Sequence, residues 1–238
     1  MHTTRLKEKR DIAEGTMEFT FARPDGFGYR AGQTIDLRLI DPPETDAEGN
    51  FRTFSLVSAP HEPVLKIATR IRDSAYKRVL AAMPEGTPLS FEGPFGSFFL
   101  HENTARPAIF LSGGIGITPF RSILSDAAER ALPHRIALLY ANRRPEDAAF
   151  LDELEAFAAK HPNFTLVPTM TGMETSREPW GGERGHIDAS MLARHVPAGT
   201  SPVYYLAGPS AMVMAMRSML IGNGVSGDDI RFEEFAGY

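Results

Sequence analysis

The 238-residue chain contains no cysteine. Disulfide bonds, cysteine-ligated zinc, a thiolate nucleophile and a cysteine-held iron–sulfur cluster are therefore excluded from these residues. An excess of basic residues is also lacking, since 25 Lys and Arg stand against 30 Asp and Glu. A sequence-independent nucleic-acid binder needs cations that neutralise phosphates, so this balance argues against that class.

Long hydrophobic runs are absent as well. The apolar stretches are broken within about a dozen residues, too short to span a bilayer. The first residues, MHTTRLKEKRDIAEG, lack the apolar core of a signal peptide. The sequence therefore predicts a cytoplasmic protein without a membrane span. No pair of its seven His has metal-ligand spacing, and His101, His134 and His161 are interpreted as surface residues near turns.

The first hundred residues contain short alternating segments separated by Gly and Pro: MEFTFARP, GQTIDLRLI, RTFSLVSAP, VLKIATRIR and TPLSFEGPFGSF. This pattern is typical of β-strands. One helical window occurs among them, at residues 74–83. The first half is predicted to form a β-barrel or sandwich.

From residue 106 onward, apolar β runs alternate with helical windows four times, and IRFEEF closes the series. Strands that alternate with helices indicate crossover connections and a parallel sheet. The length accommodates two cores. We therefore expect two domains: residues 1–103, mostly β, and residues 104–238, with an α/β fold.

The sharpest local motif is IFLSGGIGITP at residues 109–119, an apolar strand followed by a glycine turn and a helix that opens at Pro119. Glycines let the backbone approach a phosphate, and the amides at the start of a helix stabilise its charge. A tight turn of any α/β domain is the alternative interpretation. A second turn, LAGPSAM at residues 206–212, has Ser210 placed as a helix cap. Because both turns end strands of a parallel sheet, they could border one crevice.

Three basic segments could bind phosphate. YANRRPED places Arg143 and Arg144 at a strand end, although solvated surface arginines are the alternative. RTFSLVSAP puts Arg52, Phe54 and Leu56 on one face of a strand, which suits a ligand with a phosphate and a flat ring. An exposed edge strand with an incidental arginine is equally compatible. In residues 66–78, five basic residues surround a helix start at Ser74, and a solvated amphipathic helix remains the alternative.

The order RTFS, basic strand and helix, EGPFGSF, SGGIGITP, AGP and FEEF resembles the ferredoxin-NADP reductase superfamily over essentially the whole chain. The resemblance implies an antiparallel β-barrel domain that binds FAD, and an α/β domain that binds NAD(P)H, meeting in a cleft. By this similarity Arg52 would bind the flavin phosphates, with Thr53 beside it in the motif. Phe54 would contact the flavin, and Ser55 would lie near its reactive ring nitrogen. Ala68, Thr69 and Arg70 would line the isoalloxazine, and Ser74 would meet the phosphates.

On the nucleotide side, the family loop is matched by Gly114, Gly116, Thr118 and Pro119, and the second turn by Gly208 and Pro209. Arg143 matches a position near the adenosine ribose, so Arg143 and Arg144 favour NADPH over NADH. The chain departs from relatives in having Ala207 where many have Cys. Its end, FEEFAGY, also extends beyond the family's terminal aromatic residue. We expect Phe235 rather than Tyr238 to stack on the flavin, and assign Glu233 a weaker catalytic part.

These features predict a flavin-dependent reductase that passes hydride from NAD(P)H to FAD, and then electrons to a separate ferredoxin, flavodoxin or oxygenase component. A fused iron–sulfur domain is not expected. The alternative is a non-catalytic flavin- or nucleotide-binding module with a regulatory or electron-transfer assembly role.

Overall fold

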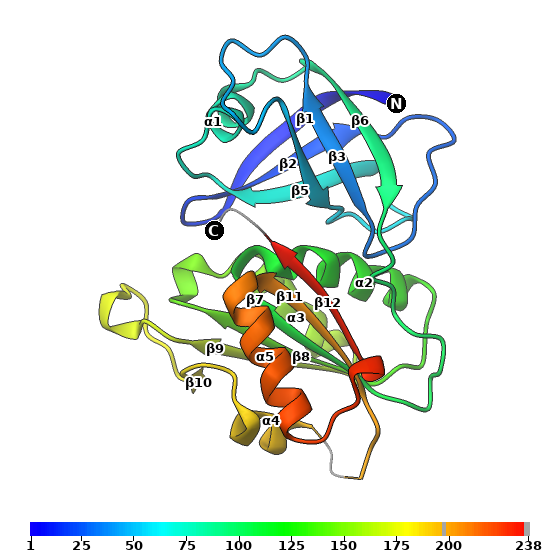
Figure 1. Cartoon of the computed structure of the whole chain (residues 1–238), viewed down its shortest axis with the longest axis vertical. Helices are drawn as coiled ribbons and strands as arrows, with labels where there is room; N and C mark the ends of the chain where they lie inside the picture. Colours follow the sequence, from blue (N-terminus) through cyan, green and yellow to red (C-terminus); the bar gives the residue numbers. More distant parts are fainter. Residues whose placement is uncertain (197–198, 236–238) are drawn as a thin grey trace. The chain divides into compact units, whose positions relative to one another are not determined.

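A computed structural model describes residues 1–196 and 199–235. The chain divides into two compact units, which are treated separately below (Figure 1). The first contains Met1–Phe99 and Thr118–Asp126, and the second contains Leu100–Ile117 and the chain from Ala127 onward. The division after residue 103 stays a prediction. In the structure, the helical segment Thr118–Asp126 belongs to the first unit, although it lies within the sequence of the second.

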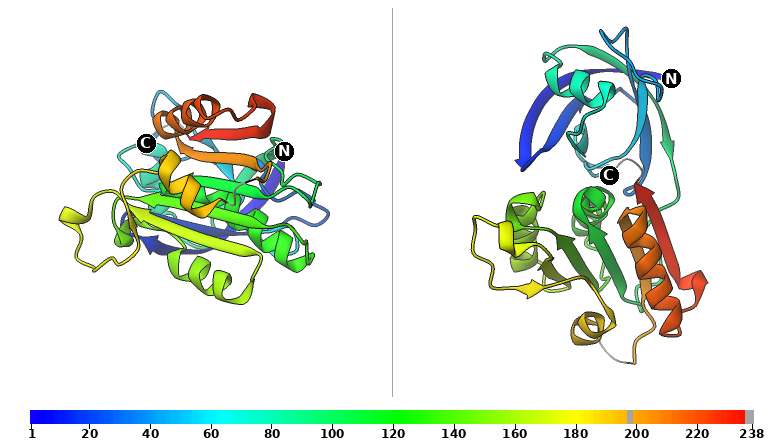
Figure 2. Two further views of the ribbon diagram at one scale, coloured as in Figure 1. Left: turned by 90° about the horizontal axis from the view of Figure 1, so that it is seen from below. Right: turned by 60° about the vertical axis from the view of Figure 1, so that its left-hand side comes forward.

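The first unit is built on a six-stranded antiparallel sheet that curls around its own core (Figures 1 and 2). In the order of the sheet the strands are β4 (Phe51–Ser55), β3 (Thr34–Leu39), β6 (Pro88–Phe95), β1 (His2–Ala13), β2 (Thr16–Ala22) and β5 (Val64–Arg70). The helix α1 (Ala75–Ala82) follows β5. The predicted β domain with one helix is confirmed, although the long strand β1 was not expected.

Buried and outward-facing side chains alternate along the strands, and the buried ones form the core of this unit. In β3, Ile35, Leu37 and Leu39 are at most 1% exposed, and the residues between them face outward. Full burial of such a side chain stabilises the fold by roughly 1.5–3 kcal/mol. Tyr76 of α1 joins this core, and its hydroxyl donates to the Leu37 carbonyl at 2.9 Å. The core therefore fixes α1 against the sheet.

A polar network ties the segment Thr118–Asp126 to the turn after β4. Ser58 is fully buried, and its carbonyl accepts from the hydroxyls of Ser122 at 2.7 Å and Tyr29 at 2.9 Å. Arg121 pairs with Glu62 and donates to the Val57 carbonyl at 3.1 Å. Buried polar groups need such partners, so this network explains why the segment belongs to the first unit.

The second unit is a parallel six-stranded sheet (Figure 1). In the order of the sheet its strands are β10 (Glu183–Arg184), β9 (Phe164–Met170), β8 (Ile136–Asn142), β7 (Ala108–Gly113), β11 (Val203–Pro209) and β12 (Ile230–Phe235). Its helices are α3 (Leu151–Lys160), α4 (Ala189–His195) and α5 (Ser210–Gly222). Helix α2 (Ile117–Glu129) follows β7, but most of it, Thr118–Asp126, belongs to the first unit. The predicted alternation is confirmed, and the two-residue strand β10 is an addition.

Helices cover both faces of this sheet, which explains its continuous apolar strands. Side chains of α4 and α5, including Met191 and Val213, pack with Leu111, Leu139 and Leu206 of the central strands. Helix α3 lies on the opposite face (Figure 2), where Phe157 contacts Phe164 edge-on. Within the described residues, no helix is long and apolar enough to cross a membrane.

The prediction that His101 and His134 lie at the surface is wrong. They are only 7% and 4% exposed, because their rings pack edge-on against each other and the His101 ring also stacks on Tyr205. The Nε2–H of His101 donates to the Arg106 carbonyl at 3.0 Å, so its Nδ1 accepts from the Tyr205 hydroxyl at 3.1 Å. Burial is the largest cause that lowers the pKa of His101.

We expect the buried His101 to make the protein sensitive to acid. Its folded-state pKa lies below the ordinary value of about 6.5, so protonation favours the unfolded chain. Its contribution to the free energy of unfolding is complete above that ordinary value and is lost as the pH falls toward the lowered one. In urea denaturation between pH 7 and 5, His101→Gln should lose less stability than wild type. His61→Gln, at an exposed position, is the control, and parallel curves for all three proteins would contradict this assignment.

Candidate functional site

Arg52 lies in β4 with its guanidinium over the ring of Tyr76, at 5.1 Å from the ring centre. Phe54, two residues later, contacts the same ring with 6.0 Å between centroids. The two side chains therefore share one face of the strand, as predicted. Phe54 and the following Ser55 are 9% and 6% exposed, whereas Thr53 points outward and donates to Asp36.

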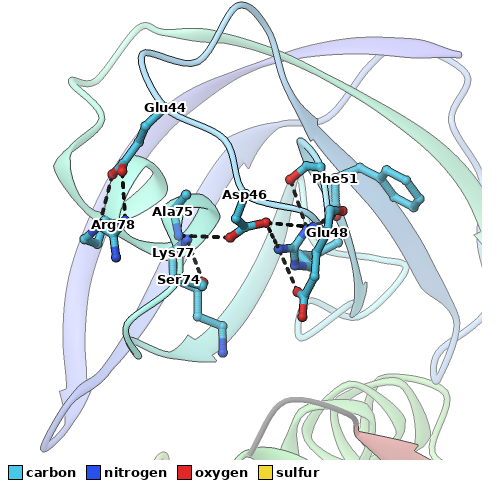
Figure 3. Close-up of polar contacts among 10 residues, drawn as sticks. Glu44, Asp46, Glu48, Phe51, Ser74, Ala75, Lys77 and Arg78 are labelled. Carbon is cyan, nitrogen blue, oxygen red and sulfur yellow. Dashed lines mark hydrogen bonds and ion pairs between the residues drawn. The ribbon is translucent and has the colours of Figure 1, made fainter.

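The guanidinium of Arg52 is surrounded by acceptors from the preceding loop. Its Nη1 donates to the carbonyls of Glu48 at 3.0 Å, Gly49 at 3.1 Å and Phe51 at 2.7 Å. Its Nη2 pairs with the carboxylates of Asp46 at 3.2 Å and Glu48 at 2.8 Å (Figure 3). The cation is thus positioned by backbone groups and neutralised by two acids.

The start of α1 lies beside Arg52 and shares one of its partners. Ser74 is the N-cap, and its hydroxyl accepts from the Lys77 amide at 3.3 Å. The amide of Ala75 donates to the second oxygen of the Asp46 carboxylate at 3.1 Å (Figure 3). A guanidinium and a helix N-terminus therefore converge on one anionic group.

The Asp46 carboxylate is charged at neutral pH. Burial raises its pKa, but the hydrogen bonds from Arg52 and from the amides of Glu48 and Ala75 outweigh this effect and lower the pKa overall. Hydrogen bonds to the charged form of an acid favour that form. The same donors would favour any other anion at this point.

The residues expected to line a flat ring lie on β5. Ala68 and Thr69 are 6% and 5% exposed, and Arg70 is half-buried at the end of the strand. Among the described strands, β5 has a regular ladder only with β2, where Ala68 lies opposite Glu18. Its other side is the end of the sheet.

In the second unit, the two predicted glycine turns lie against each other. A Cβ on Gly116 would overlap the carbonyl of Ala207, and one on Gly208 would lie 3.0 Å from the carbonyl oxygen of Gly113. Gly114 and Gly208 adopt positive φ angles of 53° and 153°. Backbone thus packs on backbone at the carboxyl end of the sheet, which confirms that the turns are neighbours.

The helices after these turns begin differently from the sequence prediction. A short 3₁₀ turn, Gly114–Gly116, precedes α2, which begins at Ile117 rather than at Pro119. Ser210 is the first residue of α5, and Pro209 is the N-cap with no side-chain hydrogen bond. Ser210 as a cap is therefore wrong, because Pro209 already has the extended backbone of the cap position.

Strand β12 brings the predicted C-terminal residues to the second glycine turn. Its parallel register with β11 sets Glu233 opposite Ala207, and Phe235 opposite Pro209. Both side chains are half-buried. Tyr238, the alternative stacking residue, lies outside the described residues, as do Ala236 and Gly237.

Arg143 and Arg144 differ in their surroundings. Arg144 is clasped to Asp147 by two hydrogen bonds of 2.9 Å, which close the turn after β8. Arg143 is exposed, and its guanidinium has no hydrogen bond or ion pair within the described residues. In the same turn, Glu146 accepts a hydrogen bond from the backbone amide of Arg177. This bond is the largest cause that lowers the pKa of Glu146 to about 2. Of Arg143 and Arg144, only Arg143 is therefore available to a ligand.

The sequence analysis overlooked two polar side chains at this edge. The Ser112 hydroxyl, at the end of β7, and both amide atoms of Asn142, at the end of β8, are buried without a hydrogen-bond partner among the described residues. Unsatisfied buried polar atoms are costly, so their persistence at strand ends points to a ligand that satisfies them. The signal available in the sequence was a polar residue at the end of an apolar run.

The side chains assembled here suit phosphate binding rather than metal or nucleophilic chemistry. Within residues 1–196 and 199–235, no group of three or more His, Asp or Glu is placed to hold a metal ion. The first unit presents an arginine beside a helix start, and the second presents a glycine-lined sheet edge. Both arrangements are typical of sites for phosphorylated ligands.

Residues 110–218 match the family described as the oxidoreductase NAD-binding domain. The chain is 30% identical to ferredoxin–NADP reductase B of Sorangium cellulosum, over 97% of this chain and 96% of that protein. It is 28% identical to the glycine betaine monooxygenase reductase subunit of Chromohalobacter salexigens, and 30% identical to the toluate 1,2-dioxygenase electron transfer component of Pseudomonas putida. The chain spans 62% and 66% of those two proteins, respectively.

Solved structures share the fold at lower identity. The flavohem-like FAD/NAD-binding domain of a Vibrio cholerae nitric oxide dioxygenase superposes with a TM-score of 0.84 at 21% identity, with 98% of each chain covered. A ferredoxin NADP+ reductase from Neisseria gonorrhoeae with bound FAD and NADP gives 0.82 at 21% identity, again with 98% of each chain covered. These likenesses establish the two-domain fold.

We expect Gly116→Ala to destabilise the protein, because its methyl group would overlap the Ala207 carbonyl. Overpacking of this kind costs about 1–3 kcal/mol. The matched control is Gly222→Ala at the end of α5, where a Cβ meets nothing within 4 Å. Urea denaturation should show a lowered free energy of unfolding for the first variant only. Equal stability of the two variants would show that the turns tolerate a side chain.

Proposed function

Because the chain belongs to the ferredoxin–NADP reductase family, we propose that it is a flavin-dependent oxidoreductase that takes hydride from NAD(P)H to FAD and passes electrons to a separate acceptor. The observation that carries this proposal is the anion site of the first unit, where Arg52 and the Ala75 amide meet one carboxylate. A site that already binds a carboxylate at two donors fits a flavin phosphate in the same place.

Residues of the first unit would bind the flavin. Arg52 and the helix start capped by Ser74 would hold the phosphates, and Phe54 would contact the flavin ring. Ser55, which follows Phe54 in β4, would lie near the reactive ring nitrogen. The strand that ends the sheet would line the isoalloxazine through Ala68, Thr69 and Arg70.

Residues of the glycine-lined edge would bind the nicotinamide nucleotide. The close backbone packing there leaves amides rather than side chains beside the ligand, which suits phosphate. The buried Ser112 hydroxyl and Asn142 amide offer hydrogen bonds that the described residues do not use. The residues proposed from the family loops are Gly114, Gly116, Thr118, Pro119, Gly208 and Pro209.

The chemistry requires little from the side chains themselves. When bound, FAD supplies the hydride acceptance and the release of electrons. The chain would contribute positioning, and well-oriented reactants can gain several kcal/mol of barrier lowering from it. Stacking of Phe235 on the flavin and a part for Glu233 stay predictions, supported by their place beside the second glycine turn.

The acceptor is proposed to be a separate redox protein: a ferredoxin, a flavodoxin or an oxygenase component. Relatives named as reductase subunits or electron transfer components of oxygenases support this choice. The 238 residues contain no cysteine for an iron–sulfur cluster of their own. A cytoplasmic location stays a prediction.

We expect the purified protein to bind FAD, to be yellow, and to bleach under anaerobic conditions when NADPH or NADH is added. Stopped-flow absorbance at the flavin band measures the rate for each nucleotide, and a screen of acceptors follows. A colourless protein without diaphorase activity after FAD addition would contradict the proposal. That result would favour the non-catalytic binding module.

Arg143→Ala should raise the KM for NADPH about tenfold, equivalent to ~1.4 kcal/mol, and leave that for NADH little changed. The reason is that its unpaired guanidinium is available to the 2′-phosphate, which NADH lacks. Arg144→Ala is the matched comparison and should lower stability instead, because it breaks the clasp with Asp147. Steady-state kinetics with both nucleotides provide the check. Equal changes for NADPH and NADH would remove Arg143 from 2′-phosphate recognition.

A further inference from the structure

The loop between β3 and β4, residues 40–50, is strongly acidic. Its sequence, IDPPETDAEGN, carries four carboxylates, those of Asp41, Glu44, Asp46 and Glu48, and no basic residue. We call this segment the acidic loop. It leads directly into the strand that bears Arg52.

Three of these four acids contact the basic groups around α1. Glu44 binds the Arg78 guanidinium with both oxygens, at 3.0 and 2.8 Å (Figure 3). Asp46 bridges Arg52 and the Ala75 amide, and Glu48 adds a second carboxylate to Arg52. The acidic loop therefore binds α1 at two places: at its start through Asp46, and at Arg78 through Glu44.

The positive charges around the start of α1 favour a bound anion, and Arg52 is not the only one of them. Lys77 is half-buried, and burial together with the nearby Arg72 and Arg52 lowers its pKa. Three cations and the positive end of a helix thus lie close together, with the carboxylates of Asp46 and Glu48 compensating them. A flavin phosphate would meet the same need.

The donors that Asp46 uses are the ones proposed for the flavin phosphates. The Ala75 amide has a single hydrogen, and it is directed at Asp46. The Nη2 of Arg52 has two hydrogens, and its two carboxylate partners, Asp46 and Glu48, already use them. The carboxylate and a phosphate oxygen are thus alternatives at this position. An occupant that belongs to the chain has the advantage of being tethered.

We propose that Asp46 is a built-in competitor for the flavin phosphates, and that the acidic loop is a lid that must release Arg52 and Ala75 before FAD binds. This inference rests on the proposed function. It makes the chain's affinity for FAD depend on the fraction of molecules in which the carboxylate has left, because binding is weakened by that fraction.

The test measures FAD binding to the purified full chain after its flavin has been removed. Asp46→Asn weakens the competing contact while keeping the size of the side chain. We expect its Kd for FAD to fall about tenfold and its association rate to rise, as followed by flavin fluorescence and stopped-flow mixing. Asp41→Asn is the matched control: it makes the same charge change in the same loop, at an exposed residue in the left-handed region that Asn tolerates.

A second variant covers the case in which Asp46→Asn does not fold, as judged by circular dichroism. Glu48→Gln removes the 2.8 Å ion pair with Arg52 but leaves the bridge from Asp46 to the helix start. It should tighten FAD binding in the same direction by a smaller factor. Arg52→Ala should weaken binding, because the phosphate loses its guanidinium.

The outcomes separate this inference from the proposed function. If wild type and Arg52→Ala differ in FAD affinity but Asp46→Asn binds no more tightly than Asp41→Asn, the competition is overturned and the flavin site stands. An unfolded Asp46→Asn together with a Glu48→Gln variant that binds FAD no better than wild type overturns it equally. If no protein binds FAD, the proposed function itself has failed.

Discussion

A guanidinium and the free amides of a helix start, placed side by side, require an anion. In the first unit this constraint falls on Arg52 and Ala75, and a carboxylate of the chain satisfies it. The core that fixes α1 through Tyr76 also supports Arg52 through its ring. Flavin binding would then replace the Asp46 carboxylate with a flavin phosphate, while Arg52 and α1 are already in place.

The second unit depends on a steric constraint instead of a charge. The turns after β7 and β11 approach so closely that a Cβ on Gly116 would overlap the Ala207 carbonyl, and one on Gly208 would be tightly packed against Gly113. This approach lines the carboxyl edge of the sheet with backbone, and it leaves Ser112 and Asn142 as buried polar groups beside it. The edge is thereby suited to a ligand that presents phosphates and hydroxyls.

Much of this architecture follows from sequence periodicity, and the exceptions have physical reasons. The alternation of strands and helices after residue 106 predicted the parallel sheet, and its central strands β7 and β11 are buried on both faces. Strand β1 escaped notice because Leu6 is its one apolar side chain in the core. His101 and His134 were misjudged because partners far along the chain, such as Tyr205, bury them.

The contacts of the candidate sites were less predictable than their residues. Arg52 and the glycine turns carry local motifs, so the sequence could point to them. The link between Asp46 and Ala75 joins residues 29 positions apart through a loop without regular structure, and no periodicity encodes it. Likewise, only the fold distinguishes the paired Arg144 from the unpaired Arg143.

Hydrogen exchange of the full chain with and without FAD shows whether the flavin displaces Asp46 from Arg52 and Ala75. FAD should slow exchange of the amides at the start of α1, from Ala75 to Lys77, and speed exchange in residues 44–49 of the acidic loop. Slow exchange in that loop and unchanged exchange at the helix start, in protein that has bound FAD, would contradict this displacement.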